Sequence, residues 1–429
     1  MGRGPSRRLL LVLPFAADHG GLEQYAVDFA RLAADHGWLV DVVAPEDLPE
    51  SSWLRRSLAG SSTWTAASSI LHAPEVRALL AVLRLRSRML TRIRGVDHGD
   101  PAVGRLRRRL VIDWFWRTRG RRLARRAALV HVLGKPKPFI QQAIRTAAAV
   151  GTPSLYTEIA HVDAEYAARP DLAGFTAVAG LLGAVHAISH AQADALRRHF
   201  GVVGRIEVID QWITPETERD LLACPPRSRR EGEPEVVVGS LCRLAPEKGL
   251  PWLIDEFAAF RRATPHDVRL VVGGTGELEG ELRDEVAAHG LEGAVELRGY
   301  QDDKAAFLSE LDVFVVTSRE EGGPISGLEA LAADRPVVST RVGAMPERLE
   351  SLDGCALVDH GATGSLAAGL EQVVTRVLEG HTPQIREAYL ARNASTVLGP
   401  RLAELWDELA GGSTSTAVAQ SAVGSASAS

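Results

Sequence analysis

Residues 313–330, Val-Phe-Val-Val-Thr-Ser-Arg-Glu-Glu-Gly-Gly-Pro-Ile-Ser-Gly-Leu-Glu-Ala, carry the clearest structural signal in the chain. An apolar run over 313–317 precedes a glycine-rich polar loop, and we expect a helix over 327–333. Short apolar runs of this kind are typical of strands that are buried on both faces of a parallel sheet. The stretch therefore predicts a β–loop–α unit with its loop at the carboxyl end of a strand, where α/β proteins bind ligands.

The same alternation extends in both directions, and it restarts after a composition shift at 214–234 that indicates a linker. We expect strands at 9–13, 38–43, 129–133, 154–156, 185–188, 205–209, 236–238, 269–272, 295–297, 336–339 and 355–358, with helices at 22–36, 139–149, 173–182, 191–200, 250–262, 277–289 and 304–310. Residues 46–73 show no clear period. The pattern predicts an α/β chain of two doubly wound, Rossmann-like domains that face each other across a cleft.

The expected boundaries follow from this pattern. The first domain covers 1–215, the second covers 216–395, a terminal helix at 396–410 packs back on the first domain, and 411–429 form a disordered tail. The tail is a Gly/Ser/Ala/Thr run without a hydrophobic period.

Composition excludes several classes of protein. The 429 residues are 45% hydrophobic and 24% charged, which is typical of a soluble globular chain. Cys224, Cys242 and Cys355 form no Cys-x-x-Cys pair, so we expect no structural zinc or iron–sulfur site and a reducing, cytoplasmic location. No apolar run reaches about 18 residues, so no spanning helix is predicted. Arg7-Arg8 faintly resembles an export signal, but a buried first strand is the favoured interpretation.

Charge is distributed unevenly. The net charge is −5, yet residues 84–126 hold fifteen Arg against three Asp, or 15 − 3 = +12. Trp114, Phe115 and Trp116 are flanked on both sides by these arginines, a composition typical of helices that lie on anionic membranes. We therefore expect an anionic membrane surface or an anionic acceptor as partner. The alternative is a solvated arginine face with the aromatic side chains in the core. No stacking or groove-reading motif indicates nucleic acid.

Two further loops have the composition of phosphate or ligand sites. Residues 239–249 contain Arg243 and Lys248 between a strand and a helix, where an anion would dock. The alternative is a solvated turn in which Lys248 pairs with Glu247 or another acid. Residues 273–276, Gly-Gly-Thr-Gly, form either a ligand loop or a plain tight turn.

The two acids of the 313–330 stretch also have alternatives. Ser326 and Glu329 have the spacing of a capping box, and Glu321 could be a solvated loop acid. Neither alternative explains the Gly322-Gly323 pair beside an acid at the end of a strand.

Taken together, the motifs resemble retaining glycosyltransferase family 4, whose members have the GT-B fold. The motifs are Gly20-Gly21, Arg243-x4-Lys248, Gly274-x-Gly276, Ser318-x-x-Glu321-Gly322-x-Pro324-x4-Glu329-Ala330, Arg335-Pro336-Val337-Val338 and Gly343-Ala344-Met345-Pro346-Glu347. The resemblance covers roughly 8–410 and is strongest over 236–347.

The resemblance implies a nucleotide diphosphate sugar as donor, with no metal or other cofactor. Arg243 and Lys248 would grip the donor diphosphate and stabilise the charge of the leaving group. Glu321 would contact the donor sugar and Glu329 the ribose hydroxyls. The remaining donor-binding residues that the resemblance implies are Gly20, Gly21, Gly274, Gly276, Gly322, Gly323, Ile325, Arg298 and Tyr300. No Asp-x-Asp motif occurs, in keeping with a reaction that needs no metal.

Departures from the family pattern are also present. The usual histidine after the strand at 154–156 is replaced by Ile159, so either His161 or Glu158 is the candidate for its role as a catalytic contact. The usual Pro-Asn-Gly is Asp210-Gln211-Trp212.

We predict a retaining enzyme that moves a hexose to a hydroxyl of a glycan or lipid-linked glycan, at the inner membrane face. The alternatives are a small natural-product acceptor, a GT-B sugar-nucleotide epimerase, and a non-catalytic sugar-nucleotide-binding protein.

Overall fold

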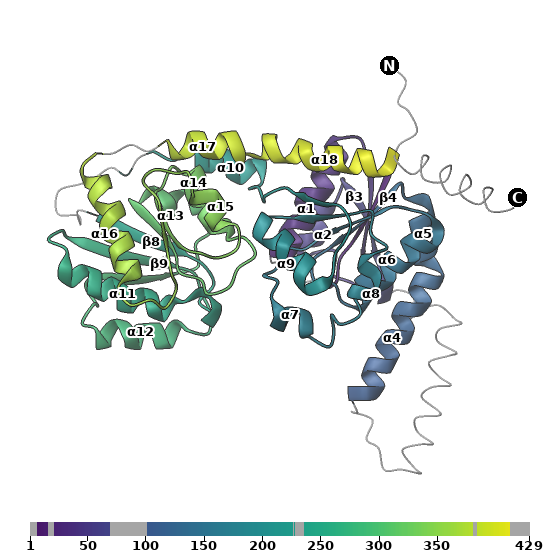
Figure 1. Cartoon of the computed structure of the whole chain (residues 1–429), viewed down its shortest axis with the longest axis horizontal. Helices are drawn as coiled ribbons and strands as arrows, with labels where there is room; N and C mark the ends of the chain where they lie inside the picture. The colour runs from purple at the N-terminus through teal and green to yellow at the C-terminus, as the bar shows by residue number, and fades with distance from the viewer. Residues whose placement is uncertain are drawn as a thin grey trace, which may run out of the picture. The chain divides into compact units, whose positions relative to one another are not determined.

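The chain folds into two compact units in the computed structural model (Figure 1). The structure describes residues 7–15, 21–68, 101–225, 227, 236–380 and 384–411, with only the backbone at 101–108. The N-terminal unit comprises 1–187, 193–208 and 402–429, and the C-terminal unit comprises 188–192 and 209–401. Each unit is an α/β fold around one parallel sheet, which confirms the predicted pair of Rossmann-like domains.

The N-terminal unit is built on seven parallel strands in the order β3-β2-β1-β4-β5-β6-β7. The strands are β1 (Arg8–Val12), β2 (Leu39–Ala44), β3 (Ser62–Ala66), β4 (Leu129–Leu133), β5 (Ser154–Thr157), β6 (Ala184–Ala187) and β7 (Ile206–Val208). The strand order reverses direction between β1 and β4, so the carboxyl ends of these two strands mark the topological switch point of the sheet.

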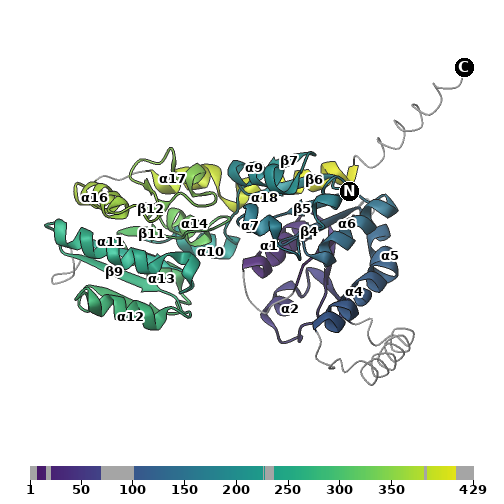
Figure 2. The same ribbon diagram turned by 60° about the horizontal axis from the view of Figure 1, so that its bottom comes forward.

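Helices cover both faces of this sheet (Figures 1 and 2). They are α1 (Gly21–Asp35), α2 (Trp53–Leu58), α4 (Pro101–Arg117), α5 (Arg119–Arg126), α6 (Pro138–Val150), α7 (Ala164–Ala168), α8 (Thr176–Ala179) and α9 (His190–Phe200). On one face, Val130 and Val132 share a core with Phe115 and Phe139 of α4 and α6. On the other, His131 stacks on Phe29 of α1.

Three expectations for this unit were wrong in detail. Residues 46–73 are not irregular throughout, because α2 and the edge strand β3 lie there. The sequence of β3 is rich in Ser and Thr, so it contains no apolar run that predicts a strand. The strand is supported by a hydrogen bond from the Thr63 hydroxyl to the carboxylate of Asp41 in β2. The helix expected at 173–182 is reduced to α8. The aromatic residues Phe115 and Trp116 lie in the core, at 0% and 2% exposure, and not on a membrane-facing surface.

The C-terminal unit is built on six parallel strands in the order β10-β9-β8-β11-β12-β13. They are β8 (Val236–Leu241), β9 (Val268–Gly273), β10 (Val295–Gly299), β11 (Val313–Val316), β12 (Val337–Thr340) and β13 (Ala356–Val358). The switch point of this sheet lies between β8 and β11. Val236 and Val238 belong to the core on one face, and Val237 belongs to the core on the other, so the sheet is buried on both sides.

The helices of this unit largely follow the strands as expected, but no helix was expected at 215–222 or at 345–349. They are α10 (Pro215–Leu222), the 3₁₀ turn η2 (Pro246–Lys248), α11 (Leu250–Ala263), α12 (Glu279–Ala288), α13 (Lys304–Ser309), α14 (Ile325–Ala332), α15 (Met345–Leu349), α16 (Ser365–Leu378) and α17 (Ile385–Arg392). The expected linker contains α10, which Thr214 caps by accepting a bond from the Thr217 amide. The helix starts there because Pro215 suits its first position.

The last described helix, α18 (Ser395–Gly411), contains the division between the two units, at residues 401 and 402. Its Trp406 is fully buried in the N-terminal unit, where the indole nitrogen donates to Nδ1 of His131 at 3.3 Å. Gly411 ends this helix, and the rest of the expected tail lies outside the described residues.

None of the helices that the structure describes combines the length and apolar character needed to cross a membrane.

Candidate functional site

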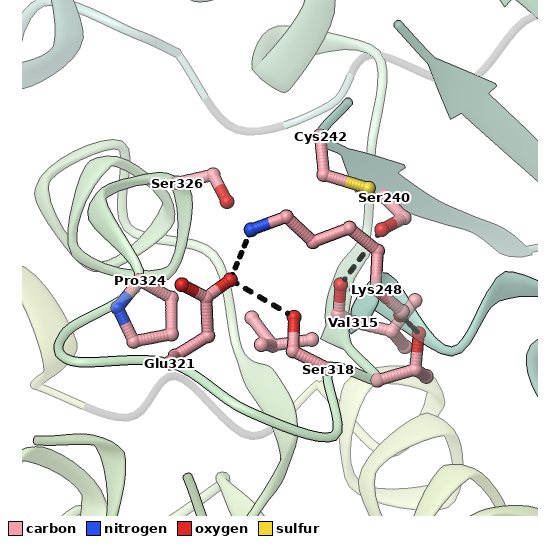
Figure 3. Close-up of a pocket in the computed structure, with 10 residues that line it drawn as sticks. Ser240, Cys242, Lys248, Val315, Ser318, Glu321, Pro324 and Ser326 are labelled. Carbon is pink, nitrogen blue, oxygen red and sulfur yellow. Dashed lines mark hydrogen bonds and ion pairs between the residues drawn. The ribbon is translucent and has the colours of Figure 1, made fainter. Parts of the chain in front are cut away.

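A pocket lies at the switch point of the C-terminal sheet, between the segments that follow β8 and β11 (Figure 3). It is lined by Ser240, Cys242, Lys248, Val315, Val316, Thr317, Ser318, Glu321, Pro324 and Ser326. The lining joins two motifs that are far apart in the sequence, the basic turn at 239–249 and the glycine-rich loop at 318–324. Parallel strand order explains why they meet, because β8 and β11 are neighbours in the sheet.

Lys248 and Glu321 form an ion pair across this pocket, between Nζ and Oε1. Each side chain is 18% exposed, so the pair is largely shielded from water. Ser318 Oγ donates to the same carboxylate oxygen at 3.1 Å. The pair places one cation and one acid side by side at the carboxyl ends of two strands.

The backbone beside Lys248 is held closely against β11. Thr317 Oγ1 donates to the Lys248 carbonyl at 2.9 Å. Gly249 has a φ of +64°, and a Cβ there would lie 2.2 Å from the Thr317 carbonyl oxygen. Only glycine tolerates both this positive φ and the close contact with the Thr317 carbonyl. The turn therefore fixes the position of the Lys248 backbone, from which the side chain extends into the pocket.

Arg243 differs from Lys248 in its exposure. Its side chain is 69% exposed, and its guanidinium pairs with Glu247 at 2.5 Å. Lys248 does pair with an acid, as one alternative expected, but that acid is Glu321, and Glu247 pairs with Arg243 instead. Arg243 is thus solvated and lies at the same turn as Lys248.

Gly274 and Gly276 are required by packing within the unit. Gly274 has a φ of +134°, and its Cβ would lie 1.8 Å from the Cys242 carbonyl oxygen. A Cβ on Gly276 would lie 2.2 Å from the carbonyl oxygen of Leu244. The glycine-rich turn thus packs directly beneath the loop that carries Arg243 and Lys248.

Glu329 is paired with a residue that the sequence did not single out. Its side chain is only 3% exposed, and Oε1 accepts from Lys304 Nζ at 2.5 Å. The capping-box alternative is wrong, because α14 begins at Ile325 with Pro324 at the cap and no side-chain cap bond. The sequence does not indicate a role for Lys304, because this residue belongs to no motif and comes close to Glu329 only in the folded chain.

The loop at 321–325 is supported from below by Arg348, which is buried at 4% exposure. Its Nη1 donates to the Pro324 carbonyl at 2.9 Å, and its Nη2 donates to Asp210 at 2.7 Å. Gln211 lies against Gly323, whose Cβ would come within 3.0 Å of the amide. The unusual Asp210-Gln211 stretch therefore has a clear structural role beside the candidate loop.

Arg298 and Tyr300 lie at and just beyond the carboxyl end of β10. Arg298 is held by two acids, with Nε 3.0 Å from Glu296 and Nη1 2.6 Å from Glu310. Tyr300 is 67% exposed. Tyr300 thus presents a free aromatic face, whereas the charge of Arg298 is already neutralised.

In the N-terminal unit, Glu158 and His161 follow β5 and differ sharply. Glu158 is fully buried and accepts from the Tyr156 and Tyr166 hydroxyls, at 2.6 and 3.0 Å, and from two backbone amides. Burial raises the pKa of this carboxyl, and the four donors oppose the rise. His161 is 42% exposed and lies 3.7 Å from Asp163. Of the two candidates, only His161 has atoms open to a ligand.

The glycine pair of the first loop is only partly described. Gly21 is the first residue of α1, and Gly20 lies outside the described residues.

One group of possible metal ligands occurs among the described residues, formed by Asp255, Glu285 and His289. His289 Nε2 already bonds to Asp255 at 2.7 Å, and none of the three lines the pocket. Cys242 does line it, but burial raises the pKa of its thiol to about 11, so the unreactive thiol form prevails at neutral pH.

Comparisons with known proteins find relatives of the segment that contains this pocket. Residues 235–376 match the family described as glycosyl transferases group 1. This segment contains β8 through most of α16, and with it the pocket. The segment that is similar to group 1 glycosyltransferases therefore lies within the C-terminal unit.

Two curated relatives show the extent of the similarity. The lipopolysaccharide core biosynthesis glycosyltransferase LpsE of Rhizobium meliloti is 34% identical over 140 residues, or 32% of this chain and 39% of the relative. The amylovoran biosynthesis glycosyltransferase AmsK of Erwinia amylovora is 29% identical over 161 residues, or 36% of this chain and 38% of the relative. The matched region thus spans about two fifths of these relatives.

Solved structures match over nearly the whole chain. Anabaena HepE, solved in complex with UDP, has a TM-score of 0.62 and 18% identity, and the match covers 94% of this chain and 100% of HepE. Sucrose-phosphate synthase of Thermosynechococcus elongatus has a TM-score of 0.64 and 18% identity, with 94% and 99% covered. These likenesses establish that the chain has the GT-B fold.

Proposed function

We propose that the protein is a glycosyltransferase that uses a nucleotide diphosphate sugar as donor. The observation that carries the proposal is the Lys248–Glu321 pair, which lies in the pocket at the β8/β11 switch point, within the segment similar to group 1 glycosyltransferases. A cation there suits the leaving diphosphate, and an adjacent acid suits the hydroxyl groups of the sugar. HepE has been solved with UDP-glucose, which makes this donor the first to test.

The roles of the individual residues follow from their burial. Lys248 is shielded, so its charge acts at short range on the phosphate oxygens of the leaving group. Arg243 is exposed and can swing toward the diphosphate when Glu247 releases it. Removing one such contact to a developing anion costs about 2–4 kcal/mol of transition-state stabilisation. Glu329, held by Lys304, would accept from the ribose hydroxyls.

The finer features of the reaction are also part of the proposal. Transfer proceeds with retention of anomeric configuration, a hexose is transferred, and no divalent metal is needed for bond cleavage, because two cations accompany the diphosphate. Full, reversible loss of turnover in EDTA would contradict the metal-free reaction.

The acceptor is proposed to be a glycan or lipid-linked glycan. By their names, LpsE takes part in lipopolysaccharide core biosynthesis and AmsK in amylovoran biosynthesis. The arginine-rich helix α5, with Arg121, Arg122 and Arg125 all exposed, supports an anionic partner such as the inner membrane face.

The test begins with a thermal-shift screen of nucleotides and nucleotide sugars. A ligand that binds only the folded protein raises stability by RT ln(1 + [L]/Kd). A stabilising donor is then assayed for hydrolysis and transfer, and NMR of the product gives the anomeric configuration. If neither UDP nor any other nucleoside diphosphate stabilises the protein, the donor site is wrongly assigned.

A further inference from the structure

The chain uses lysine very rarely, and its few lysines are placed in a pattern. It contains 45 arginines but only four lysines, at positions 135, 137, 248 and 304. All four lie between a parallel strand and the helix that follows it, or at the first residue of that helix. Lys248 and Lys304 hold the two acids of the candidate donor site. A compact ammonium suits a phosphate group, so the other two lysines are of interest.

Lys135 and Lys137 follow β4 at the switch point of the N-terminal sheet. The two sheets share one topology, with order β2-β1-β4-β5 in one and β9-β8-β11-β12 in the other. The loop after β4 therefore occupies the position that the loop at 318–324 occupies after β11. In the C-terminal unit this position lines the pocket, and ligands of doubly wound sheets bind at such points.

The lysine-bearing loop is tight and well anchored. The Gly134 amide donates to the Thr157 carbonyl at 2.8 Å, and Gly134 has a φ of +75°. The Lys137 amide donates to the Lys135 carbonyl at 2.7 Å. Lys137 Nζ lies 5.0 Å from the centre of the Phe15 ring, on the segment after β1. The loop is thus held between the ends of β1 and β5, and both lysines are half-buried.

The position of these charges is unfavourable for the fold itself. Lys137 is the N-cap residue of α6 and makes no side-chain cap bond. Ser, Thr, Asp and Asn are favoured at this position, and a cation there opposes the helix dipole. No carboxylate of the described residues pairs with either lysine, in contrast to Lys248 and Lys304. Residues that are unfavourable for local helix stability, and that no contact within the protein compensates, are typical of functional sites.

We propose that Lys135 and Lys137 bind a phosphate group of the acceptor. The inference rests on the proposed glycosyltransferase function, which it deepens by assigning the acceptor a phosphoryl group. Two ammonium groups on one short loop, both half-buried and without acidic partners, fit a phosphomonoester or diphosphate. The phosphate belongs either to a soluble sugar phosphate or to a polyprenyl phosphate, and the two sources can be separated by experiment.

The experiment measures binding by calorimetry in the presence of saturating UDP, which occupies the donor diphosphate site. The probes are glucose 6-phosphate with glucose as its uncharged match, and geranyl phosphate with geraniol. The wild type is expected to bind at least one phosphate probe and neither uncharged match. The double variant K135Q/K137Q is expected to bind that probe at least tenfold more weakly. Preference for glucose 6-phosphate or for geranyl phosphate identifies the source.

The control variant is R197Q/R198Q, which removes the same charge from an exposed face of α9 in the same unit. It should bind the phosphate probe as the wild type does. UDP binding should be equal in all three proteins. K135R/K137R keeps the charge and should recover part of the affinity.

Stability provides an independent readout. Since the lysines oppose the dipole of α6, K135Q/K137Q should have an unchanged or higher Tm. A Tm lower by several degrees would mean that the lysines are structural and would overturn the proposal. So would phosphate binding that is equal in the double variant, or wild-type protein that binds UDP but neither phosphate probe. Failure of the wild type to bind any nucleoside diphosphate would instead contradict the proposed function.

Discussion

The ammonium of Lys248 and the carboxylate of Glu321, 73 residues apart in the chain, form an ion pair inside the pocket. Lys248 is proposed to hold the leaving diphosphate and Glu321 the donor sugar, so each group neutralises the other in the free protein. A donor must separate or rearrange this pair as it binds. The pair also makes the two side chains interdependent, because removal of one leaves the other shielded without its partner.

We predict that Lys248→Met lowers kcat/KM by about 10²–10³-fold, equivalent to about 2.7–4 kcal/mol of lost transition-state stabilisation. Arg243→Ala should act in the same direction but less strongly, because Arg243 is 69% exposed and its interactions are screened by water. Steady-state kinetics with the donor found in the nucleotide screen provide the measurement.

The interdependence of the pair is tested by a double-mutant cycle with Glu321→Gln, which alone should mainly lower kcat. The double variant should lose much less than the sum of the two single losses, because the groups touch. Arg283→Gln, which removes an exposed ion pair on α12, serves as control and should leave kcat/KM unchanged. Near-normal kcat/KM in Lys248→Met would show that the pocket is not the donor site.

A second prediction concerns Lys304 and Glu329. Lys304→Met leaves a carboxylate that is 97% shielded without its cation, so Glu329 can no longer be held as a charged acceptor for ribose hydroxyls. UDP affinity should fall about tenfold, or ~1.4 kcal/mol. Because Glu329 is remote from the reacting bond, kcat at saturating donor should change little.

Lys304→Arg keeps the charge and should recover most of the affinity. The sharpest comparison uses 2′,3′-dideoxy-UDP, which lacks the hydroxyls in question and should bind equally to wild type and Lys304→Met. Equal loss of affinity for UDP and the dideoxy analogue would show that Lys304 does not act through ribose recognition.

The third prediction is a pH dependence in the N-terminal unit. His131 is fully buried, and burial holds its pKa well below the ordinary value, with His186 adding to the effect. The unfolded chain takes up a proton below about pH 6.5 and the native state does not, so acid favours unfolding. The free energy of unfolding should fall by up to about 1.4 kcal/mol per pH unit below pH 6.5.

Guanidinium unfolding followed by tryptophan fluorescence, at pH 7.5, 6.5 and 5.5, measures this slope. His131→Gln keeps a hydrogen-bond donor toward Thr157, which His131 Nε2 contacts at 2.7 Å. The variant should lower the dependence of the unfolding free energy on pH by the contribution of about one proton. His36→Gln, on an exposed position, should keep it. An unchanged slope in His131→Gln would mean that other groups control the acid sensitivity.

Much of this architecture follows from local patterns. The apolar runs at 236–238 and 313–317 predict β8 and β11, and parallel order then requires their loops to meet. The site was harder to predict where it depends on tertiary contacts. Lys304 reaches Glu329 across 25 residues of chain, and no spacing rule indicates such a pair.

Two other failures have a physical cause. β3 was missed because an edge strand stabilised by polar pairs such as Thr63 with Asp41 carries little apolar signal. Phe115 and Trp116 were predicted to face a membrane because arginines flank them in the sequence. That pattern does not reveal that one side of α4 packs on α6. Trp116 lies against Phe139 of α6, with ring centres 5.2 Å apart. The composition of residues 84–126 gives the charge of this segment, but it does not show whether its aromatic side chains face the core or the solvent.

The burial of those rings sharpens the last prediction, which concerns binding to anionic vesicles. Arg121, Arg122 and Arg125 of α5 are exposed, and each contributes about 1 kcal/mol near an anionic surface, within a Debye length of ~8 Å. Because Phe115 and Trp116 are buried, these two rings add no apolar anchoring that resists salt. Co-sedimentation with phosphatidylglycerol vesicles should therefore be strong at low salt and should fall steeply at high salt.

Charge reversal at Arg121, Arg122 and Arg125 should abolish this co-sedimentation at low salt while UDP binding in the C-terminal unit stays intact. Reversal of Arg197 and Arg198 on α9 changes the net charge by a comparable amount at a different site, and that variant should still sediment. Residual binding of the wild type at high salt would point to an apolar anchor outside these arginines. Failure of the wild type to sediment even at low salt would remove the membrane from the proposal and leave α5 as a solvated face.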